Sequence, residues 1–238
     1  MKITFLGASH GVPEANRRCS CTMVEVSGRY YFVDMGIMAV NELVTRGIPV
    51  DGVKGIFITH MHGDHTNGLL SFVDLISWYF KSADPEIFLP RIEGAKIIQD
   101  WLALNATAYK DIRYREVTPG VVFDDGFLKV TAIATQHCQK SYAYLLEAEG
   151  KRVLFTGDLK RPGEDFPGVI REGYTDLVVC EAAHFPATEY LPVLRDCRIG
   201  KVVVNHYVTW NIANVLQLAK DINEVPVALA NDGMEVQI

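Results

Sequence analysis

Apolar residues along the chain fall into two kinds of segment. Runs of about four to eight mostly apolar residues predict buried strands, and they cover residues 2–6, 22–26, 30–33, 53–58, 128–135, 152–155, 177–180 and 201–204. Apolar residues at helical spacing predict helices, and these cover residues 37–46, 69–80 and 91–103. From residue 113 to residue 146 the pattern changes to short strands with turns, so we expect a second sheet to begin there.

A polar stretch follows the strand predicted at residues 53–58. Three imidazoles and a carboxylate lie within six positions, as His60, His62, Asp64 and His65. Polar groups gathered in this way are costly to bury unless a ligand satisfies them, and a metal ion is the obvious ligand. In an extended backbone His60 and His62 point the same way. Gly63 then lets Asp64 and His65 turn toward a second point.

Two metal ions therefore fit this stretch better than one. Imidazole combined with carboxylate suits zinc, manganese or iron, and the lack of cysteine in the stretch argues against a closed structural zinc site. The alternative interpretation is a solvated loop that happens to be rich in histidine.

Other polar residues also follow predicted strands. They are Asp34 after residues 30–33, His137 after 128–135, Asp158 after 152–155, His184 in Glu181-Ala182-Ala183-His184 after 177–180, and His206 after 201–204. Taken singly, each of them could be a capped or buried polar residue. As an ordered series together with the histidine-rich stretch, Asp34, His137, Asp158 and His206 leave little room for chance, whereas His184 stays unassigned.

The motif His60-x-His62-x-Asp64-His65 resembles the signature of the metallo-β-lactamase superfamily. The resemblance implies an α/β (α+β) fold, a four-layer αββα sandwich with one or two metal ions at the edge between its sheets. It assigns His60, His62 and His137 to a first ion, Asp64, His65 and His206 to a second ion, and Asp158 to both. Asp34, in Asp34-Met35-Gly36, would support the metal loop without touching metal, which is compatible with a helix N-cap.

The two ends of the chain resemble one branch of that superfamily. Residues 6–13 with the arginines after them resemble the opening of ribonuclease Z and of the cyclic-nucleotide phosphodiesterase of phosphonate breakdown, and residues 231–236 resemble the ending of the latter. The resemblance implies hydrolysis of a phosphodiester by a metal-bound hydroxide. The tRNA-gripping arm of ribonuclease Z has no counterpart, since residues 156–177 predict only a short loop and turn. The extra zinc-binding cysteines of the phosphonate-pathway enzyme are also missing.

Composition narrows the range of partners. The 238 residues carry a formal net charge of -6, so the chain has no general electrostatic footprint for a polyanion, and long nucleic acid is disfavoured. No run reaches the roughly 18 apolar residues of a membrane span. Five scattered cysteines fit a reducing compartment, and we predict a cytoplasmic protein of one domain over residues 1–238. We interpret His10, Cys19 and Cys21 as having no catalytic or metal-binding role, and the aromatic residues 78–80 as core.

The resulting hypothesis is a metal-dependent hydrolase of small or cyclic phosphodiesters. Its cofactors are two divalent ions, zinc first, with manganese or iron as alternatives. Asp64 and His184 are the candidate catalytic residues, with His184 contacting the phosphate or protonating the leaving group. The predicted partner is a small phosphodiester, with no membrane, and a homodimer is compatible with the sequence.

Three other functions use the same scaffold. A thioester or lactam hydrolase would bind the same metals and differ in a substrate panel. An iron-dependent oxidoreductase would consume oxygen. A non-catalytic metal-binding protein would bind ions and turn over nothing.

Overall fold

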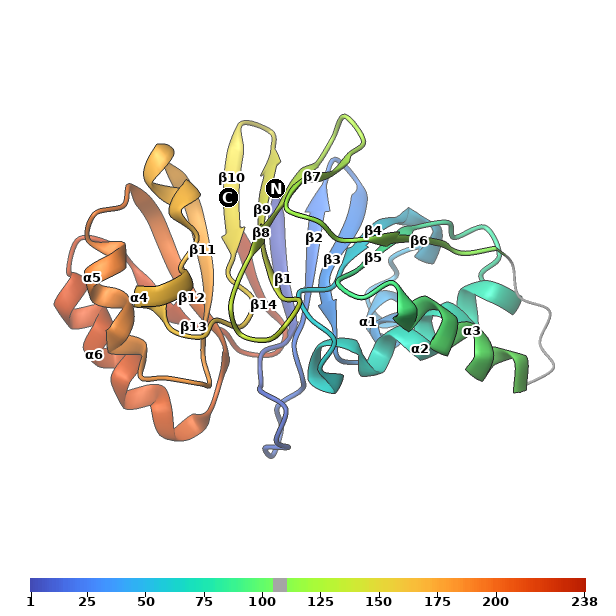
Figure 1. Ribbon diagram of the computed structural model, residues 1–238, viewed down its shortest axis with the longest axis horizontal. Coiled ribbons are helices and arrows are strands. Elements are labelled where there is room, and N and C mark those ends of the chain that lie inside the picture. The colour runs from blue at the N-terminus through green and yellow to red at the C-terminus, as the bar shows by residue number, and fades with distance from the viewer. Residues whose placement is uncertain (105–110) are drawn as a thin grey trace.

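The protein has four layers. The structure is a computed structural model, and it describes residues 1–104 and 111–238. Figure 1 shows two sheets standing side by side in the middle, with helices α1 to α3 on one outer side and α4 to α6 on the other. The predicted αββα sandwich is confirmed.

The first sheet has seven strands in the order β14-β1-β2-β3-β4-β5-β6. Their bounds are Lys2–Gly7 (β1), Cys21–Val26 (β2), Arg29–Met35 (β3), Val53–Phe57 (β4), Glu86–Leu89 (β5), Arg113–Glu116 (β6) and Met234–Gln237 (β14). Strands β14, β1, β2 and β3 pair antiparallel, and β3 to β6 pair parallel. The C-terminal strand β14 thus completes the sheet that the N-terminal strand begins.

The second sheet also has seven strands, in the order β13-β12-β11-β10-β9-β8-β7. Their bounds are Gly120–Asp124 (β7), Lys129–Ala134 (β8), Tyr142–Ala148 (β9), Lys151–Phe155 (β10), Thr175–Ala182 (β11), Ile199–Tyr207 (β12) and Val227–Leu229 (β13). Strands β10 to β13 are parallel, so their carboxyl ends meet at one edge of the sheet.

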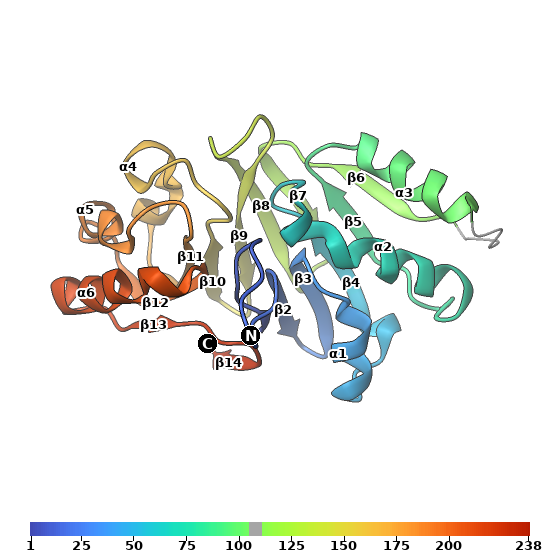
Figure 2. The same cartoon turned by 90° about the horizontal axis from the view of Figure 1, so that it is seen from below.

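Helices cover the outer face of each sheet (Figure 2). The first sheet carries α1 (Ala39–Thr45), α2 (Gly63–Trp78) and α3 (Glu93–Leu104), and the second carries α4 (Pro162–Asp165), α5 (Leu191–Leu194) and α6 (Ile212–Ile222). Short 3-10 turns lie at Val50–Gly52, Gly168–Glu172, Ala187–Tyr190 and Thr209–Asn211. Each helix group buries its apolar stripe against its sheet, with Phe72 in the first interface and Tyr190 in the second. Among the described residues, none of the helices combines the length and hydrophobicity that a membrane span requires.

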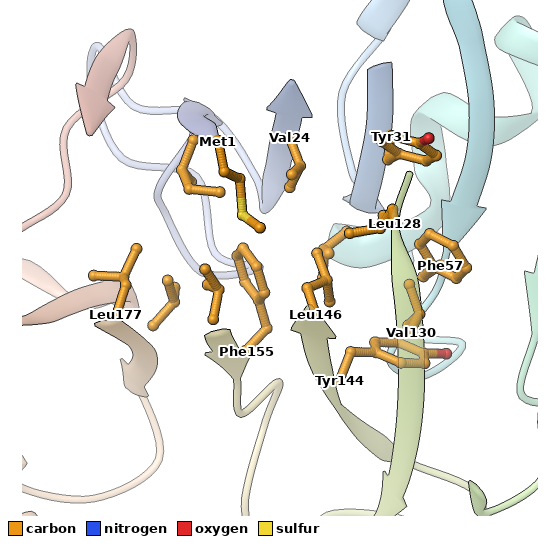
Figure 3. Close-up of a cluster of buried hydrophobic side chains, with 14 of the residues drawn as sticks. Met1, Val24, Tyr31, Phe57, Leu128, Val130, Tyr144, Leu146, Phe155 and Leu177 are labelled. Atoms are coloured by element: carbon orange, nitrogen blue, oxygen red, sulfur yellow. The ribbon is translucent and has the colours of Figure 1, made fainter. Parts of the chain in front are cut away.

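A third apolar cluster joins the two sheets. Figure 3 shows Val24 and Tyr31 of the first sheet, with Met1 just before β1, facing Tyr144 and Phe155 of the second sheet. Burying a large side chain of this kind contributes about 1.5–3 kcal/mol. Because protein interiors are close-packed, this layer fixes the two sheets against each other and so fixes the strand ends that carry the polar residues.

The structure corrects the boundary between the sheets. The second sheet begins at Gly120 and not near residue 113, because Arg113–Glu116 pairs in parallel with Glu86–Leu89 at the edge of the first sheet. Strand pairing is a long-range choice that the local pattern does not contain. Residues 156–177, predicted as a loop and turn, also hold the short helix Pro162–Asp165 and a 3-10 turn.

Two predictions about α2 were wrong. The helix begins at Gly63 and not at Leu69, so part of the histidine-rich stretch is helical; a carboxylate in the first turn, here Asp64, suits the positive end of a helix. Trp78 and Tyr79 are not core, since they are 47% and 65% exposed. They end the helix on its solvent side, where the apolar stripe no longer faces the sheet.

Candidate metal centre

The predicted site residues converge at one edge of the sandwich. His60 and His62 follow β4, and Asp64 and His65 lie in the first turn of α2. Of the other predicted site residues, His137 follows β8, Asp158 follows β10 and His184 follows β11. His206 lies at the end of β12. The carboxyl ends of parallel strands share an edge, which explains why residues so far apart in sequence meet.

The first three-residue set is compact. Nδ1 of His62 lies 2.9 Å from Nε2 of His60 and 3.3 Å from Nε2 of His137. Tetrahedral ligands about 2.0–2.1 Å from one zinc ion lie about 3.4 Å from each other. These three nitrogens therefore fit a single ion of that size.

The second set has the same spacing. Nε2 of His65 lies 2.9 Å from Nε2 of His206, and Oδ2 of Asp64 lies 3.3 Å from His206 and 3.6 Å from His65. Within the described residues, each of the two predicted sets has its ligand atoms close enough together to hold a metal ion.

One oxygen of Asp158 lies between the two sets. Its Oδ2 is 3.6 Å from Nε2 of His60, His65 and His137 and 3.4 Å from Nε2 of His206. Asp158 is only 3% exposed, and burial raises the pKa of its carboxyl group. Within the described part of the chain its Oδ1 is buried without a hydrogen-bond partner. A buried carboxylate so placed fits a position shared by two cations.

Three of the site imidazoles, those of His60, His137 and His206, have lowered pKa values. Burial and the neighbouring histidines lower the pKa of His60 and His206 strongly, and lower the pKa of His137 to about 4. A neutral imidazole is the form that binds metal. Burial also lowers the pKa of His65, but Asp34 and other carboxylates outweigh it and raise the pKa to about 10. The site therefore favours positive charge at His65, which a cation can supply in place of the proton. The residues present fit a dinuclear divalent-metal centre.

Asp34 contacts the side of His65 that faces away from the other candidate ligands; its predicted supporting role stays a prediction. Nδ1 of His65 donates to its Oδ2 over 2.7 Å, and Thr59 donates to it from both the backbone nitrogen (2.8 Å) and Oγ1 (3.0 Å). The prediction missed Thr59, whose Oγ1 also lies 3.1 Å from Nδ1 of His60. Its place directly before the first histidine was the available signal. Together Asp34 and Thr59 hold the outer nitrogens of two ligands and so orient both rings.

The structure leaves no room for a side chain at position 36, two residues after Asp34. A Cβ at this position would lie 1.8 Å from the backbone oxygen of Asp64. The glycine therefore lets the first turn of α2 approach the loop that carries Asp34. At this distance His65 of that turn can donate a hydrogen bond to Asp34.

A protein-family model described as "Anti-Pycsar protein Apyc1" matches residues 1–183 of the 238. The chain belongs to this family. Two curated relatives are ribonucleases Z. That of Listeria monocytogenes serotype 4b (strain CLIP80459) is 31% identical over 226 residues, which cover 92% of this chain and 72% of the relative. That of Archaeoglobus fulgidus is 32% identical over 155 residues, 65% of this chain. The chain spans about half the length of several such relatives, 50% in the second case.

Solved structures identify the fold of this family member. Human tRNase Z, short form, has a TM-score of 0.79 at 22% identity, covering 100% of this chain and 99% of that chain. The metallo-β-lactamase fold protein YhfI from Bacillus subtilis has a TM-score of 0.78 at 18% identity, covering 99% and 98%. The ribonuclease Z relatives together with this shared fold confirm the resemblance to the metallo-β-lactamase superfamily that the histidine motif predicted.

His184 lies beside the two sets and outside both. Its Nδ1 donates to Oε2 of Glu181 over 2.7 Å and is 3.8 Å from Oδ2 of Asp158. The hydrogen bond to Glu181 raises the pKa of His184 to about 9. Glu181 is 1% exposed and also accepts the backbone N–H groups of Leu159 and Ala183, so it is fixed. The sequence prediction missed Glu181 as a functional residue, although an acid ending an apolar strand was a usable signal.

His10, Cys19 and Cys21 belong to none of the candidate metal groups found among the described residues. His10 accepts the backbone N–H of Val12 and lies 3.6 Å from Glu14. Cys19 and Cys21 are free thiols. Their assignment to non-catalytic roles stays a prediction.

Proposed function

We propose that this chain is a metal-dependent hydrolase that cleaves small or cyclic phosphodiesters. The observation that carries the proposal is the position of Asp158 Oδ2 between two complete donor sets, at 3.4 to 3.6 Å from four imidazole nitrogens. Two-metal centres with ions about 3.5–4 Å apart serve in-line displacement at phosphorus.

The ligand roles follow the two sets. His60, His62 and His137 would hold one ion, Asp64, His65 and His206 the other, and Asp158 both, with zinc as the first choice for imidazole and carboxylate donors. When bound, the ions would supply an ionised water near pH 7 and stabilise the negative charge that builds on the phosphoryl oxygens.

His184 is proposed as the general acid. Its Nδ1–H is held by the buried Glu181, which fixes the ring and leaves Nε2 to give a proton to the departing alkoxide. Because the carboxylate stabilises the imidazolium, the ring can carry that proton between turnovers. A catalytic pair of His184 and Glu181 thus complements the metal set.

The choice of a small substrate rests on charge. A net charge of -6 offers little attraction to a long polyanion. The relatives named ribonuclease Z favour a second candidate, an RNA substrate. The chain aligns to only part of those relatives, so we place the small phosphodiester first and RNA second.

One experiment tests the proposal. Purified protein is analysed for zinc, manganese and iron, and the metal-replete form is assayed on bis-nitrophenyl phosphate, cyclic nucleotides, cyclic ribose phosphates, a thioester and a lactam. We expect phosphodiester hydrolysis that a chelator removes and added metal restores. Turnover of the thioester or lactam alone, oxygen consumption by iron-loaded protein, or two bound ions without any turnover would overturn it in favour of the corresponding alternative.

A further inference from the structure

The loop between β1 and β2, residues 8–20, leaves the first sheet, contacts β12 of the second sheet and returns to the first. It extends beyond the sandwich in dark blue in Figure 1. Ser9 forms an isolated parallel bridge with Tyr207, next to the candidate ligand His206. A Cβ at Gly11 would lie 2.9 Å from Oδ2 of Asp64, another member of the second set. The loop therefore packs against the second set and belongs to the wall of the centre.

Arg17 fastens this loop to Tyr207. Its Nη1 donates to the backbone oxygen of Tyr207 over 2.9 Å, and its Nη2 donates to the backbone oxygen of Ala8 over 2.9 Å. The guanidinium also lies 4.0 Å from the centroid of the Tyr207 ring. Its side chain is only 14% exposed, so these contacts are largely shielded from water.

Glu14 binds Thr209, which follows His206 in the chain. It accepts a hydrogen bond from Arg17, and its Oε1 accepts from the backbone nitrogen (3.0 Å) and Oγ1 (2.8 Å) of Thr209. Arg17 and Glu14 thus hold the chain at Tyr207 and at Thr209.

His206 depends on these backbone contacts because, among the described residues, its ring lacks the hydrogen bond that usually orients a metal-binding histidine. In the part of the chain that the structure describes, Nδ1 of His206 is buried without a hydrogen-bond partner. By contrast, the outer nitrogens of His65 and His60 contact Asp34 and Thr59. His206 also has a left-handed backbone at φ 43°, which a non-glycine residue keeps only when its surroundings impose it.

We infer that Arg17, braced by Glu14, is the positioning residue for His206 and sets the affinity of the second metal site. Its guanidinium holds the backbone next to His206, so the direction of the imidazole is fixed through the main chain rather than through Nδ1. This inference rests on the second metal set of the proposed function.

The test is a titration of metal-free protein with Co²⁺, followed by the absorption of the bound ion. Arg17→Met should leave the first site unchanged and weaken the second by about 10–100-fold, the range seen when a partner of a ligand is lost. Arg17→Lys should give an affinity of the second site between those of the wild-type protein and Arg17→Met, because an ammonium group does not reproduce the planar two-point contact. Arg18→Met is the matched control, since Arg18 pairs with Glu42 and Asp232 instead; it should keep both affinities.

Glu14→Gln provides a second variant in case Arg17→Met does not fold, as judged by circular dichroism. It should weaken the second site less than Arg17→Met. Wild-type affinities at both sites in the Arg17 and Glu14 variants would overturn the inference alone. So would equal weakening of both sites, which indicates a general loss of structure. Uptake of a single ion by the wild-type protein would overturn the two-metal part of the proposed function, and the inference with it.

Discussion

At the residue scale, two aspartates of the centre differ in what they touch. Oδ2 of Asp158 lies beside imidazoles of both sets, whereas the contacts of Asp34 among the described residues are with the outer nitrogen of His65 and with Thr59. Asp158→Ala should therefore lose both ions. Asp34→Asn should keep the first and weaken the second by about 10–100-fold. Elemental analysis after dialysis checks this; equal metal content in the two variants would contradict the assignment.

His184 gives a second prediction at this scale. If its ring protonates the leaving group, His184→Ala should bind two ions and lose about 10²–10⁴-fold in rate on a diester with an alkoxide leaving group. With nitrophenolate, which departs without help, the loss should be much smaller. Glu181→Gln should show the same contrast to a lesser degree. Equal losses on both substrates would mean that His184 positions the phosphate, and no loss would return it to a structural role.

At the element scale, the site depends on how closely α2 approaches the loop after β3. Gly36→Ala places a methyl group 1.8 Å from the Asp64 backbone oxygen, so the helix must shift. Overpacking of this kind costs about 1–3 kcal/mol or more. We expect a lower melting temperature together with weaker binding at the second site, measured by thermal unfolding and metal titration. Gly163→Ala is the control, because a Cβ added there would have no atom of the described residues, apart from its own chain neighbours, within 4 Å. A similar loss there would rule out the close approach as the cause.

At the scale of the whole molecule, the centre joins the two sheets. His60, His62, Asp64 and His65 come from the first sheet side, and His137, Asp158 and His206 from the second. Ions that bind only the folded state stabilise it by about 4 kcal/mol when present at 1,000 times their dissociation constant. Chelation should therefore lower the melting temperature by several degrees, and zinc should restore it. Asp158→Ala should abolish the difference; a chelator-insensitive wild-type protein would contradict a centre that links the sheets.

Net charge belongs to the same scale. With a charge of -6, we expect cyclic nucleotides to be cleaved with a rate that varies little with salt, and precursor tRNA to be a poor substrate at physiological salt. Competition assays at two ionic strengths measure both. Efficient cleavage of tRNA would reverse the order of the two candidate substrates.

The sequence by itself identified the candidate metal ligands and, through the resemblance of its histidine motif, the fold class. The spacing of His60, His62, Asp64 and His65, and the strand ends before His137, Asp158 and His206, are local features, because a strand and the polar residue after it are adjacent in the chain. The supporting role of Asp34 was predicted from the resemblance of Asp34-Met35-Gly36 to the superfamily pattern. The motif then tied these residues to a known four-layer sandwich.

Only the tertiary structure decided which distant groups meet. The pairing of β6 with β5 and the contact of Arg17 with Tyr207 join residues that lie far apart in the chain, and their local sequence carries no trace of the contact. The early start of α2 at Gly63 belongs here too, since the glycine at position 36 that lets its first turn approach lies far back in the chain. Local pattern records burial and backbone preference, whereas these contacts depend on how two packed sheets bring separate strand ends to one edge.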